Sequence, residues 1–354
     1  MDPPYRLTLF WAAAPGEEIP AWLLQLPNVR LRRIPLPERL ATILWQRARV
    51  PLPVEALIGR QDLCHFPDFV MPPVWRARTV LTVHDLSFRR VPEAADPGLG
   101  RFLNRAVPRS VWGADLVLAD SVATQRDIVE LLGAKEAKTA VLYSGVGAEF
   151  DRNYRAAELD AVRQRYHLPD RFILSLGTLQ PRKNYGRLIQ AFGRLCVQPA
   201  FDWHLVIAGR PGWLYGDLST LVAKLGLESR VHVVTNASDA DLPALYTLAG
   251  AFVLLSLYEG FGIPPLEAMA RGTPVLVSNV SSLPEVVGDA GLQVDPLDLD
   301  AITQQIRRLL DDTELRRNLV TRGTARAATF TWARAAQRLV QLYDQTLRST
   351  PASE

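Results

Sequence analysis

Residues 251–278 read AFVLLSLYEGFGIPPLEAMARGTPVLVS, and this stretch predicts the fold of the half of the chain that contains it. The apolar run 251–257 has the length and the branching of a buried parallel strand, and 274–277 is a second such run. Between them we expect a glycine-rich corner and a short helix that begins near Pro264 and Pro265, because proline fixes φ for a helix start. A strand, a helix and a second strand in this order are the unit of a parallel α/β sheet.

The corner itself carries groups suited to a ligand. Gly260 and Gly262 flank Phe261, so we expect a backbone with positive φ that approaches a ligand closely and offers free N–H groups to an anion. Glu259 ends the strand and Glu267 lies in the first turns of the helix, so both can face one crevice. Taken alone, each glutamate is better explained by the helix dipole or by a solvated loop. Together, two carboxylates beside an amide nest indicate a ligand with hydroxyl groups.

Fixed cations follow an earlier strand. Residues 172–184, FILSLGTLQPRKN, run off a strand through Gly177 to Arg182 and Lys183 at a helix start. Such cations suit a diphosphate, because arginine chelates two oxygens and lysine adds a point charge. A charge pair is more often a solvated surface feature, but its place after a strand and a glycine corner favours a binding role. The next strand ends at Gly209, which lets the backbone pass close to the same ligand.

Two histidines accompany apolar runs in the N-terminal half. His84 and Asp85 follow the run 79–83, and His65 lies in the run 63–66. Side chains at the end of a parallel strand can reach a ligand cleft, although a lone histidine is more often structural. His84 and Asp85 are therefore candidate ligand contacts, and His65 is a second histidine of this kind.

The composition bounds the class of protein. A chain of 354 residues exceeds one comfortable core, so two domains are expected, and 48% hydrophobic residues suffice for both. No apolar run reaches the length of a membrane span and the N-terminus lacks a signal-peptide pattern, so we predict a cytoplasmic protein. Cys64 and Cys196 lie in apolar contexts without metal-ligand spacing, which predicts buried free thiols.

Strands alternate with helices along the chain, which predicts parallel, doubly wound sheets in two Rossmann-like domains, 1–160 and 161–331. The terminal helix, 332–347, is a candidate to pack back on the first domain. A polar stretch, 151–170, is expected to be irregular and to contain the linker. The expected strands are 5–11, 29–34, 63–66, 79–83, 116–119, 139–142, 172–176, 205–208, 231–234, 252–255 and 275–277. The expected helices include 40–50, 98–112, 122–132 with Ser121 as its cap, 298–310 and 313–328.

The two glutamates and the loop between them carry a resemblance to a known family. The sequence E-G-F-G-x-P-x-x-E at 259–267 resembles the signature of the family 4 retaining glycosyltransferases, and R-K at 182–183 resembles the pyrophosphate element of that family. The resemblance covers most of the chain from Tyr5 and is strongest over 172–296. It implies a glycosyltransferase B fold, in which two Rossmann-like domains face a cleft. The C-terminal domain then binds a nucleotide sugar and the N-terminal domain binds the acceptor.

The resemblance also implies the role of each matched residue. Glu259 would contact hydroxyls of the donor sugar, Glu267 would hold the ribose, and His84 would lie near the primary hydroxyl of the sugar. Arg182 and Lys183 would neutralise the leaving diphosphate, so no metal and no cofactor beyond the nucleotide sugar is expected. The catalytic residues are then His84, Arg182, Lys183 and Glu259; the donor-binding residues are Gly177, Gly209, Gly260, Phe261, Gly262, Ile263 and Glu267; the candidate acceptor or sugar contacts are His65 and Asp85.

The implied activity is that of a retaining, metal-independent hexosyltransferase with an oxocarbenium-like transition state. The overall likeness favours mannose from GDP-mannose, with UDP-glucose next, and a glycan or lipid-linked acceptor in cell-surface polysaccharide synthesis. The base, sugar, acceptor and linkage stay open, and no nucleic-acid partner is expected. A glycan phosphorylase would need a lysine-bound pyridoxal phosphate, and a dehydrogenase would need a G-x-G-x-x-G motif, which the sequence does not contain. A non-catalytic nucleotide-sugar-binding module stays open as an alternative.

Charge sets the N-terminal half apart. Residues 25–110 hold fourteen arginines and seven acidic residues, an excess of seven positive charges in a chain whose net charge is +3. This excess suits an anionic acceptor and a peripheral contact with the anionic inner face of the membrane, although a solvated basic surface explains it equally well.

The start of the chain also differs from the family pattern. Family members open with a strand, a glycine-rich loop and a long helix before a strand that resembles residues 5–10. We therefore expect the N-terminal domain to lack its first strand and helix, which would leave a gap in the sheet. Either the domain closes by re-pairing of its strands, or the natural start lies upstream of Met1.

Overall fold

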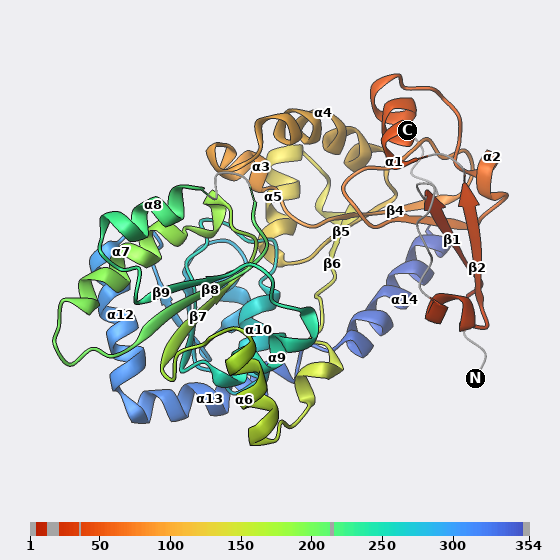
Figure 1. Cartoon of the computed structure of the whole chain (residues 1–354). Helices are drawn as coiled ribbons and strands as arrows, with labels where there is room; N and C mark the ends of the chain where they lie inside the picture. The colour runs from red at the N-terminus through yellow and green to blue at the C-terminus, as the bar shows by residue number, and fades with distance from the viewer. Residues whose placement is uncertain (1–4, 13–20, 35–36, 213–215, 350–354) are drawn as a thin grey trace. The chain divides into compact units, whose positions relative to one another are not determined.

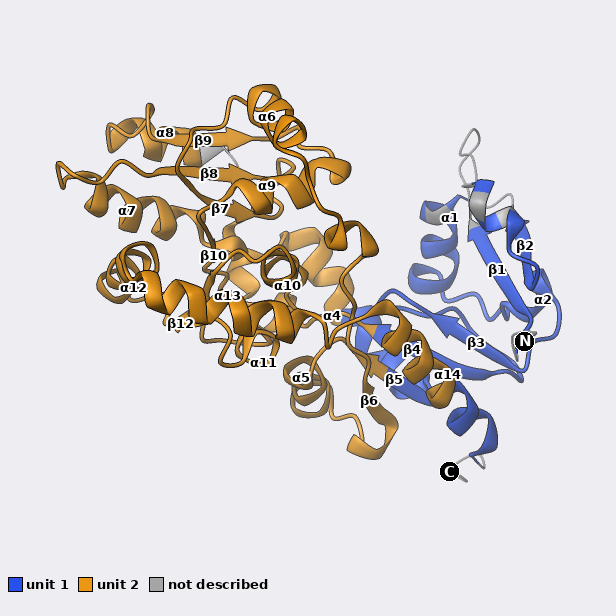
Figure 2. Ribbon diagram, turned by 90° about the horizontal axis from the view of Figure 1, so that it is seen from below, with its two compact units in different colours: residues 1–82, 105–117, 343–354 blue, residues 83–104, 118–342 orange. Residues whose placement is uncertain are grey.

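The computed structural model describes residues 5–12, 21–34, 37–212 and 216–349 of the chain (Figure 1). The chain divides into two compact units. Unit 1 comprises residues 1–82, 105–117 and 343–354, and unit 2 comprises residues 83–104 and 118–342 (Figure 2). The expected domains 1–160 and 161–331 rest on a different boundary and stay a prediction.

Unit 2 is built around a six-stranded sheet. The strands lie in the order β12-β11-β10-β7-β8-β9, and each pair of neighbours is parallel. The order changes direction at β7 and β10, which is where a doubly wound sheet opens a crevice beyond the carboxyl ends of its strands. The strands are β7 (Phe172–Leu176), β8 (His204–Ala208), β9 (Val231–Val234), β10 (Ala251–Leu254), β11 (Val275–Ser278) and β12 (Leu292–Val294).

Alternate residues of these strands enter separate cores. Phe172 and Leu174 belong to one buried cluster and Ile173 to another, because successive side chains of a strand point to opposite faces. Both faces are thus apolar and covered by helices, as a parallel sheet requires (Figure 1). The helices of this half are α7 (Tyr185–Cys196), α8 (Gly216–Lys224), α9 (Leu242–Leu248), α10 (Ile263–Ala270), α11 (Leu283–Val287), α12 (Leu299–Asp311) and α13 (Thr313–Ala327).

The N-terminal strands form two sheets. Strand β1 (Leu7–Ala12) pairs in parallel with β2 (Val29–Ile34), and a separate sheet has the order β3-β4-β5-β6. A cavity of about 420 Å³ is lined by residues of both β1 and β3 (Leu63–Phe66). The other strands are β4 (Arg78–Val83), β5 (Leu116–Ala119) and β6 (Thr139–Val141).

The helices of the N-terminal half follow local signals. Helix α5 (Val122–Leu132) begins where predicted, because the Ser121 hydroxyl accepts a hydrogen bond of 3.0 Å from the Thr124 N–H. It ends at Gly133, whose φ of 67° is left-handed. The other helices are α1 (Glu38–Thr42), α2 (Glu55–Ile58), α3 (Ser87–Arg90), α4 (Pro97–Gly113), α6 (Ala156–Arg165) and α14 (Trp332–Arg348).

Two expected elements differ in the structure. The single helix expected over 40–50 is instead α1 followed by a π-helical turn, Ile43–Arg47. The stretch 151–170 contains helix α6 and is therefore not irregular throughout. Its residues are good helix formers, and the Glu158 carboxylate accepts a hydrogen bond of 2.9 Å from the Arg155 N–H at the helix start.

Three further findings concern the cysteines, membrane-spanning helices and metal-binding groups of the described residues. Cys64 is free and buried, and Cys196 is free but only half-buried. Among the described residues, no helix combines the length and the apolar character that crossing a bilayer requires. The same residues include no group of three or more His, Cys, Asp or Glu side chains placed to hold a metal ion; metal independence stays a prediction.

Candidate functional site

The loops that follow β7 and β10 meet at a buried cluster of charges. Lys183 Nζ lies 2.6 Å from Glu259 Oε1, and Arg182 Nη1 lies 2.9 Å from Glu259 Oε2. Arg182 also donates to the Tyr258 carbonyl at 2.6 Å, and the Leu257 N–H donates to the Arg182 carbonyl at 2.9 Å. Because β7 and β10 are adjacent strands, residues 76 positions apart in sequence are brought into direct contact.

The charge of Glu259 depends on these two cations. Burial alone would raise the pKa of this carboxyl group, but Lys183 and Arg182 together lower it to about 2. A hydrogen bond of 2.5 Å from the Ser256 hydroxyl also favours the ionised form. Glu259 is therefore a carboxylate at neutral pH, and with two cations the cluster keeps a formal charge of +1.

Two serines in the segment between β11 and α11 hold the backbone of the motif. The Glu259 N–H donates to the Ser281 hydroxyl at 2.9 Å. The Ser282 hydroxyl lies 2.9 Å from the Glu259 carbonyl and 2.5 Å from the Phe261 carbonyl, to which it donates. The sequence analysis misses Ser256, Ser281 and Ser282, since serines after a strand are common and nothing in their spacing distinguishes them.

The glycines of the motif act in different ways. Gly262 has the expected positive φ, 121°, and precedes α10. Gly260 is not among the glycines with positive φ, so the expectation for that residue is wrong. A Cβ at Gly260 would lie only 2.1 Å from the His84 carbonyl oxygen. Gly260 therefore allows the chain around His84 to approach the motif.

The backbone amides that follow Gly260 have no hydrogen-bond partner among the described residues of the protein. Within the part of the chain that the structure describes, the N–H groups of Phe261, Gly262 and Ile263 donate no hydrogen bond. The side chain of Phe261 is buried and its ring stacks on Tyr143 with centroids 5.8 Å apart. The packed ring fixes the backbone and with it the direction of these amides; their contact with a donor stays a prediction.

The stretch after β4 contributes side chains from the other side of Gly260. His84 Nδ1 lies 2.9 Å from Asp120 Oδ2, and the His84 side chain is 45% exposed. The Asp85 carboxylate accepts a hydrogen bond of 2.8 Å from the Ser87 N–H. Asp120 therefore orients the imidazole, and Asp85 caps the start of α3, so Asp85 has a structural partner besides any ligand role.

Hydrogen bonds from helix α5 also reach the motif. The Thr124 hydroxyl donates to the Gly260 carbonyl at 3.1 Å, and the Tyr258 hydroxyl donates to Asp127 Oδ2 at 2.6 Å. The Thr124 hydroxyl also lies 3.5 Å from the His84 carbonyl, so Thr124 links the backbone of His84 to that of the E-G-F-G loop. The structure brings His84, Arg182, Lys183 and Glu259 into one neighbourhood.

The second glutamate has a different environment. Glu267 is mostly buried and accepts a hydrogen bond of 2.8 Å from the Tyr246 hydroxyl. Burial raises the pKa of Glu267 to about 7, and the charges of Glu149 and Asp239 act in the same direction. The two carboxyls of the motif therefore have very different acidities, and Tyr246 is a partner that the sequence does not reveal.

The remaining predicted glycines lie where two loops cross. A Cβ at Gly209 would lie 2.0 Å from the Gly177 carbonyl oxygen, and a Cβ at Gly177 would lie 2.9 Å from Lys183 Cε. The Tyr185 hydroxyl donates to the Gly177 carbonyl at 2.8 Å. These glycines let the loops after β7 and β8 pack closely beside Lys183; their contact with a donor stays a prediction.

His65 lies in unit 1 with both ring nitrogens engaged. Its Nδ1 is 2.7 Å from the Tyr343 hydroxyl and its Nε2 is 2.8 Å from the Thr82 hydroxyl. A direct contact between His65 and a sugar would have to replace one of these bonds. Its role as a sugar contact stays a prediction.

Comparison with known proteins gives a consistent result. The family model "Glycosyl transferases group 1" matches residues 160–326, and "Glycosyltransferase Family 4" matches residues 4–150. The chain is similar to O-antigen chain mannosyltransferase B of Escherichia coli, with 35% identity over 280 residues that cover 79% of this chain and 73% of that protein.

Two further similarities differ in extent. The serotype-specific mannosyltransferase WbdA of Escherichia coli is 32% identical over 283 residues, which cover 78% of this chain but 34% of WbdA. The solved structure of sucrose-phosphate synthase from Thermosynechococcus elongatus superposes with a TM-score of 0.77 at 21% identity, covering 98% of this chain and 90% of that one.

Proposed function

The chain belongs to the group 1 glycosyltransferases, and we propose that it is a retaining hexosyltransferase that moves mannose from a nucleotide diphosphate sugar to a glycan or lipid-linked acceptor. It has the glycosyltransferase B fold that the sequence predicts. The observation that carries the proposal is the contact of Arg182 and Lys183 with Glu259, beside the unbonded amides of the E-G-F-G loop.

The cluster suits the departure of a diphosphate. When the bond between the sugar C1 and the diphosphate oxygen breaks, its electron pair moves to that oxygen, and Arg182 and Lys183 stabilise the charge that develops there. The acceptor oxygen bonds to C1 from the same face and gives its proton to the leaving phosphate. Glu259 is held by both cations and by Ser256, so it orients sugar hydroxyls and is not the nucleophile.

The remaining features of the proposal rest on the relatives and on charge. The similar proteins named as mannosyltransferases favour mannose and a role in polysaccharide synthesis, with a UDP-glucose-type transfer as the alternative. We place the protein in the cytoplasm with a peripheral contact at the inner face of the membrane, supported by the arginine excess in residues 25–110. Equal sedimentation with neutral and anionic vesicles at low salt would contradict that contact.

A donor screen tests the activity directly. GDP-mannose, UDP-glucose and related donors are compared by thermal shift, because a bound donor stabilises the fold by mass action. Each stabilising donor is then incubated with candidate acceptors, and the anomeric configuration of the product is read by NMR. An inverted product would refute the retaining mechanism, and donor binding without any transfer would favour the non-catalytic alternative.

Lys183→Ala is the decisive variant. Loss of a cation that stabilises the developing diphosphate charge should raise the barrier by roughly 2 to 4 kcal/mol, a reduction of about 30- to 1,000-fold in kcat. Lys224→Ala is the matched control, because Lys224 is exposed at the end of α8 and contacts neither glutamate of the motif. Normal turnover by a folded Lys183→Ala protein would refute the assignment.

A further inference from the structure

One face of the β1–β2 sheet is strongly basic. The parallel register pairs Thr8 with Arg30 and Phe10 with Arg32. Paired residues of a parallel sheet share a face and successive residues alternate, so Thr8, Arg30 and Arg32 point to the same side. Arg6 lies two positions before Thr8 and continues this face, whereas Arg33 belongs to the opposite one.

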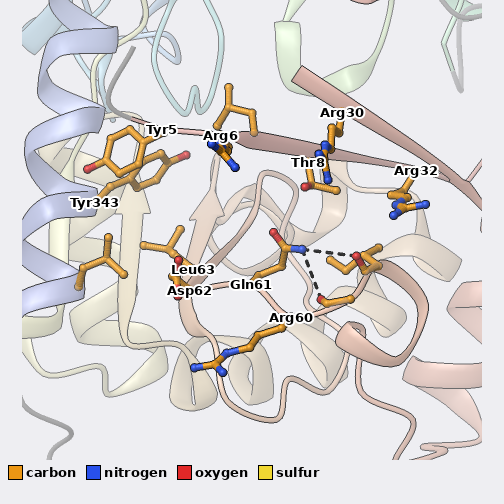
Figure 3. Close-up of a pocket in the computed structure, with 14 residues that line it drawn as sticks. Tyr5, Arg6, Thr8, Arg30, Arg32, Arg60, Gln61, Asp62, Leu63 and Tyr343 are labelled. Carbon is orange, nitrogen blue, oxygen red and sulfur yellow. Dashed lines mark hydrogen bonds between the residues drawn. The ribbon is translucent and has the colours of Figure 1, made fainter. Parts of the chain in front are cut away.

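This basic face forms a wall of a cavity of about 760 Å³ within unit 1 (Figure 3). Arg6, Arg30 and Arg32 contribute from the strands. The segment that joins α2 to β3 contributes Arg60 and Gln61 (Figure 3). Small-molecule sites occupy roughly 300 to 1,000 Å³, so the cavity is large enough for a phosphorylated sugar or a lipid headgroup.

The charge of the cavity is not balanced by the protein. Four arginines line it, and Asp62 is the acidic residue among the lining side chains. Among the described residues, none of these four arginines forms an ion pair; Arg78, by contrast, lies 3.0 Å from Asp115 in the same unit. Like charges that converge on one cavity repel each other unless a ligand supplies the opposite charge.

The other side chains of the cavity suit a polar ligand. Gln61 Nε2 donates to the carbonyls of Ile58 and Gly59 at 3.4 and 3.3 Å, which orients its side chain. The rings of Tyr5 and Tyr343 meet edge to face with centroids 5.9 Å apart and form a further wall (Figure 3). Arginine forks suit phosphate oxygens in particular, because two parallel N–H groups can bind two oxygens.

The cavity faces the strand ends opposite to those at which ligands of parallel α/β sheets react. It lies at the amino ends of β1 and β3, since Arg6 and Asp62 immediately precede these strands. Ligands that react in parallel α/β sheets bind beyond the carboxyl ends of the strands. We propose that this cavity is an accessory site that binds a phosphate group, carried by a phosphorylated glycan or by a phospholipid headgroup.

Two double variants test the proposal with equal changes of charge. Arg30→Gln/Arg32→Gln removes two arginines from the cavity. Arg33→Gln/Arg39→Gln removes two exposed arginines of the same segment that do not line it. Calorimetric titration with glucose 6-phosphate, and flotation with phosphatidylglycerol or phosphatidylcholine vesicles, are performed on the full chain without a donor. The result is therefore independent of the transfer reaction.

We expect the unsubstituted protein to bind glucose 6-phosphate or the phosphatidylglycerol vesicles. The cavity variant should bind about tenfold or more weakly, and the control variant should stay within about twofold. Binding of the soluble ester identifies a phosphorylated glycan as the source of the phosphate, and binding of vesicles alone identifies a lipid. Equal losses in both variants, or no binding of either probe, would overturn the proposal.

A third variant tests the site if the double substitution in the cavity impairs folding. If Arg30→Gln/Arg32→Gln melts well below the unsubstituted protein, Arg60→Gln replaces it, because Arg60 is exposed beyond the end of α2 and supports no strand. Arg60→Gln should weaken binding of the same probe severalfold while its melting temperature stays unchanged. Unchanged binding by this variant would then count against the site.

Discussion

Replacing Glu259 by glutamine should destabilise the fold at neutral pH, because it leaves two buried cations without their counter-charge. The pKa of Glu259 falls from its ordinary value of 4.5 to about 2. A difference of roughly 2.5 pKa units at about 1.4 kcal/mol per unit corresponds to roughly 3 kcal/mol of folding free energy at pH 7. Breaking a buried pair by removing one partner typically costs 3–5 kcal/mol, which is of the same order.

The pH dependence of this effect has a defined sign. A carboxyl whose pKa is depressed by folding stabilises the protein above its unfolded pKa, and this contribution is lost as the pH falls through the folded pKa. The window therefore runs from about 4.5 down to about 2. The gap in stability between the original protein and Glu259→Gln should be full at pH 7 and roughly half as large at pH 3.

Urea unfolding at both pH values measures the gap, and Glu267→Gln is the matched control in the same motif. The pKa of Glu267 is raised by burial to about 7, so ionisation of Glu267 costs stability as the pH rises from about 4.5 through 7. Glu267→Gln should thus be close to neutral at pH 4 and stabilising at pH 8. Equal unfolding free energies of Glu259→Gln and the original protein at pH 7 would refute the reasoning.

Two further variants probe contacts of the motif. Gly260→Ala should cost on the order of 1 to 3 kcal/mol in thermal unfolding, since its Cβ would lie 2.1 Å from the His84 carbonyl; Gly100→Ala, where the nearest atom is 4.0 Å away, should have little effect. Tyr246→Phe removes a hydrogen bond that lowers the pKa of Glu267, so the pH at which donor affinity changes should move upward. An unchanged profile of donor KM against pH would contradict a role of Glu267 in donor binding.

Part of the fold follows from the sequence because the central strands of the larger sheets are buried on both faces. Such strands are mainly apolar runs that end at a polar residue or glycine, so the predicted bounds of β5 and β7 are those of the structure. Helix α6 lacks this signal. Val162 is buried and Leu159 is partly buried against the core, but the remaining residues are charged, polar or alanine, so no apolar run marks the helix in the sequence.

The motif residues of the candidate site can be predicted from the sequence, but the contacts between them cannot. The spacing of the motif residues identifies them in the sequence. Their contacts with one another, however, depend on which strands become neighbours in the sheet. Nothing in the sequence says that Glu259 binds Lys183 directly, because this contact follows from β7 and β10 lying side by side. The hydrogen bond from Tyr246 of α9 to Glu267 is equally unpredictable from the sequence, since a buried tyrosine on a helix is usually an ordinary core residue.

In the proposed reaction, the direct contact would let one cluster both bind the donor and promote its cleavage. Glu259 offsets one of its two cations and leaves a formal charge of +1. A nucleotide diphosphate sugar carries one negative charge on each phosphate, and its leaving group gains a further charge as the glycosidic bond breaks. A cluster with surplus positive charge stabilises that more anionic state more strongly than the ground state, and only such a difference speeds the chemical step. Glu259 would thereby weaken the binding of the intact donor by the two cations, while the cations would still stabilise the charge that develops on the leaving diphosphate.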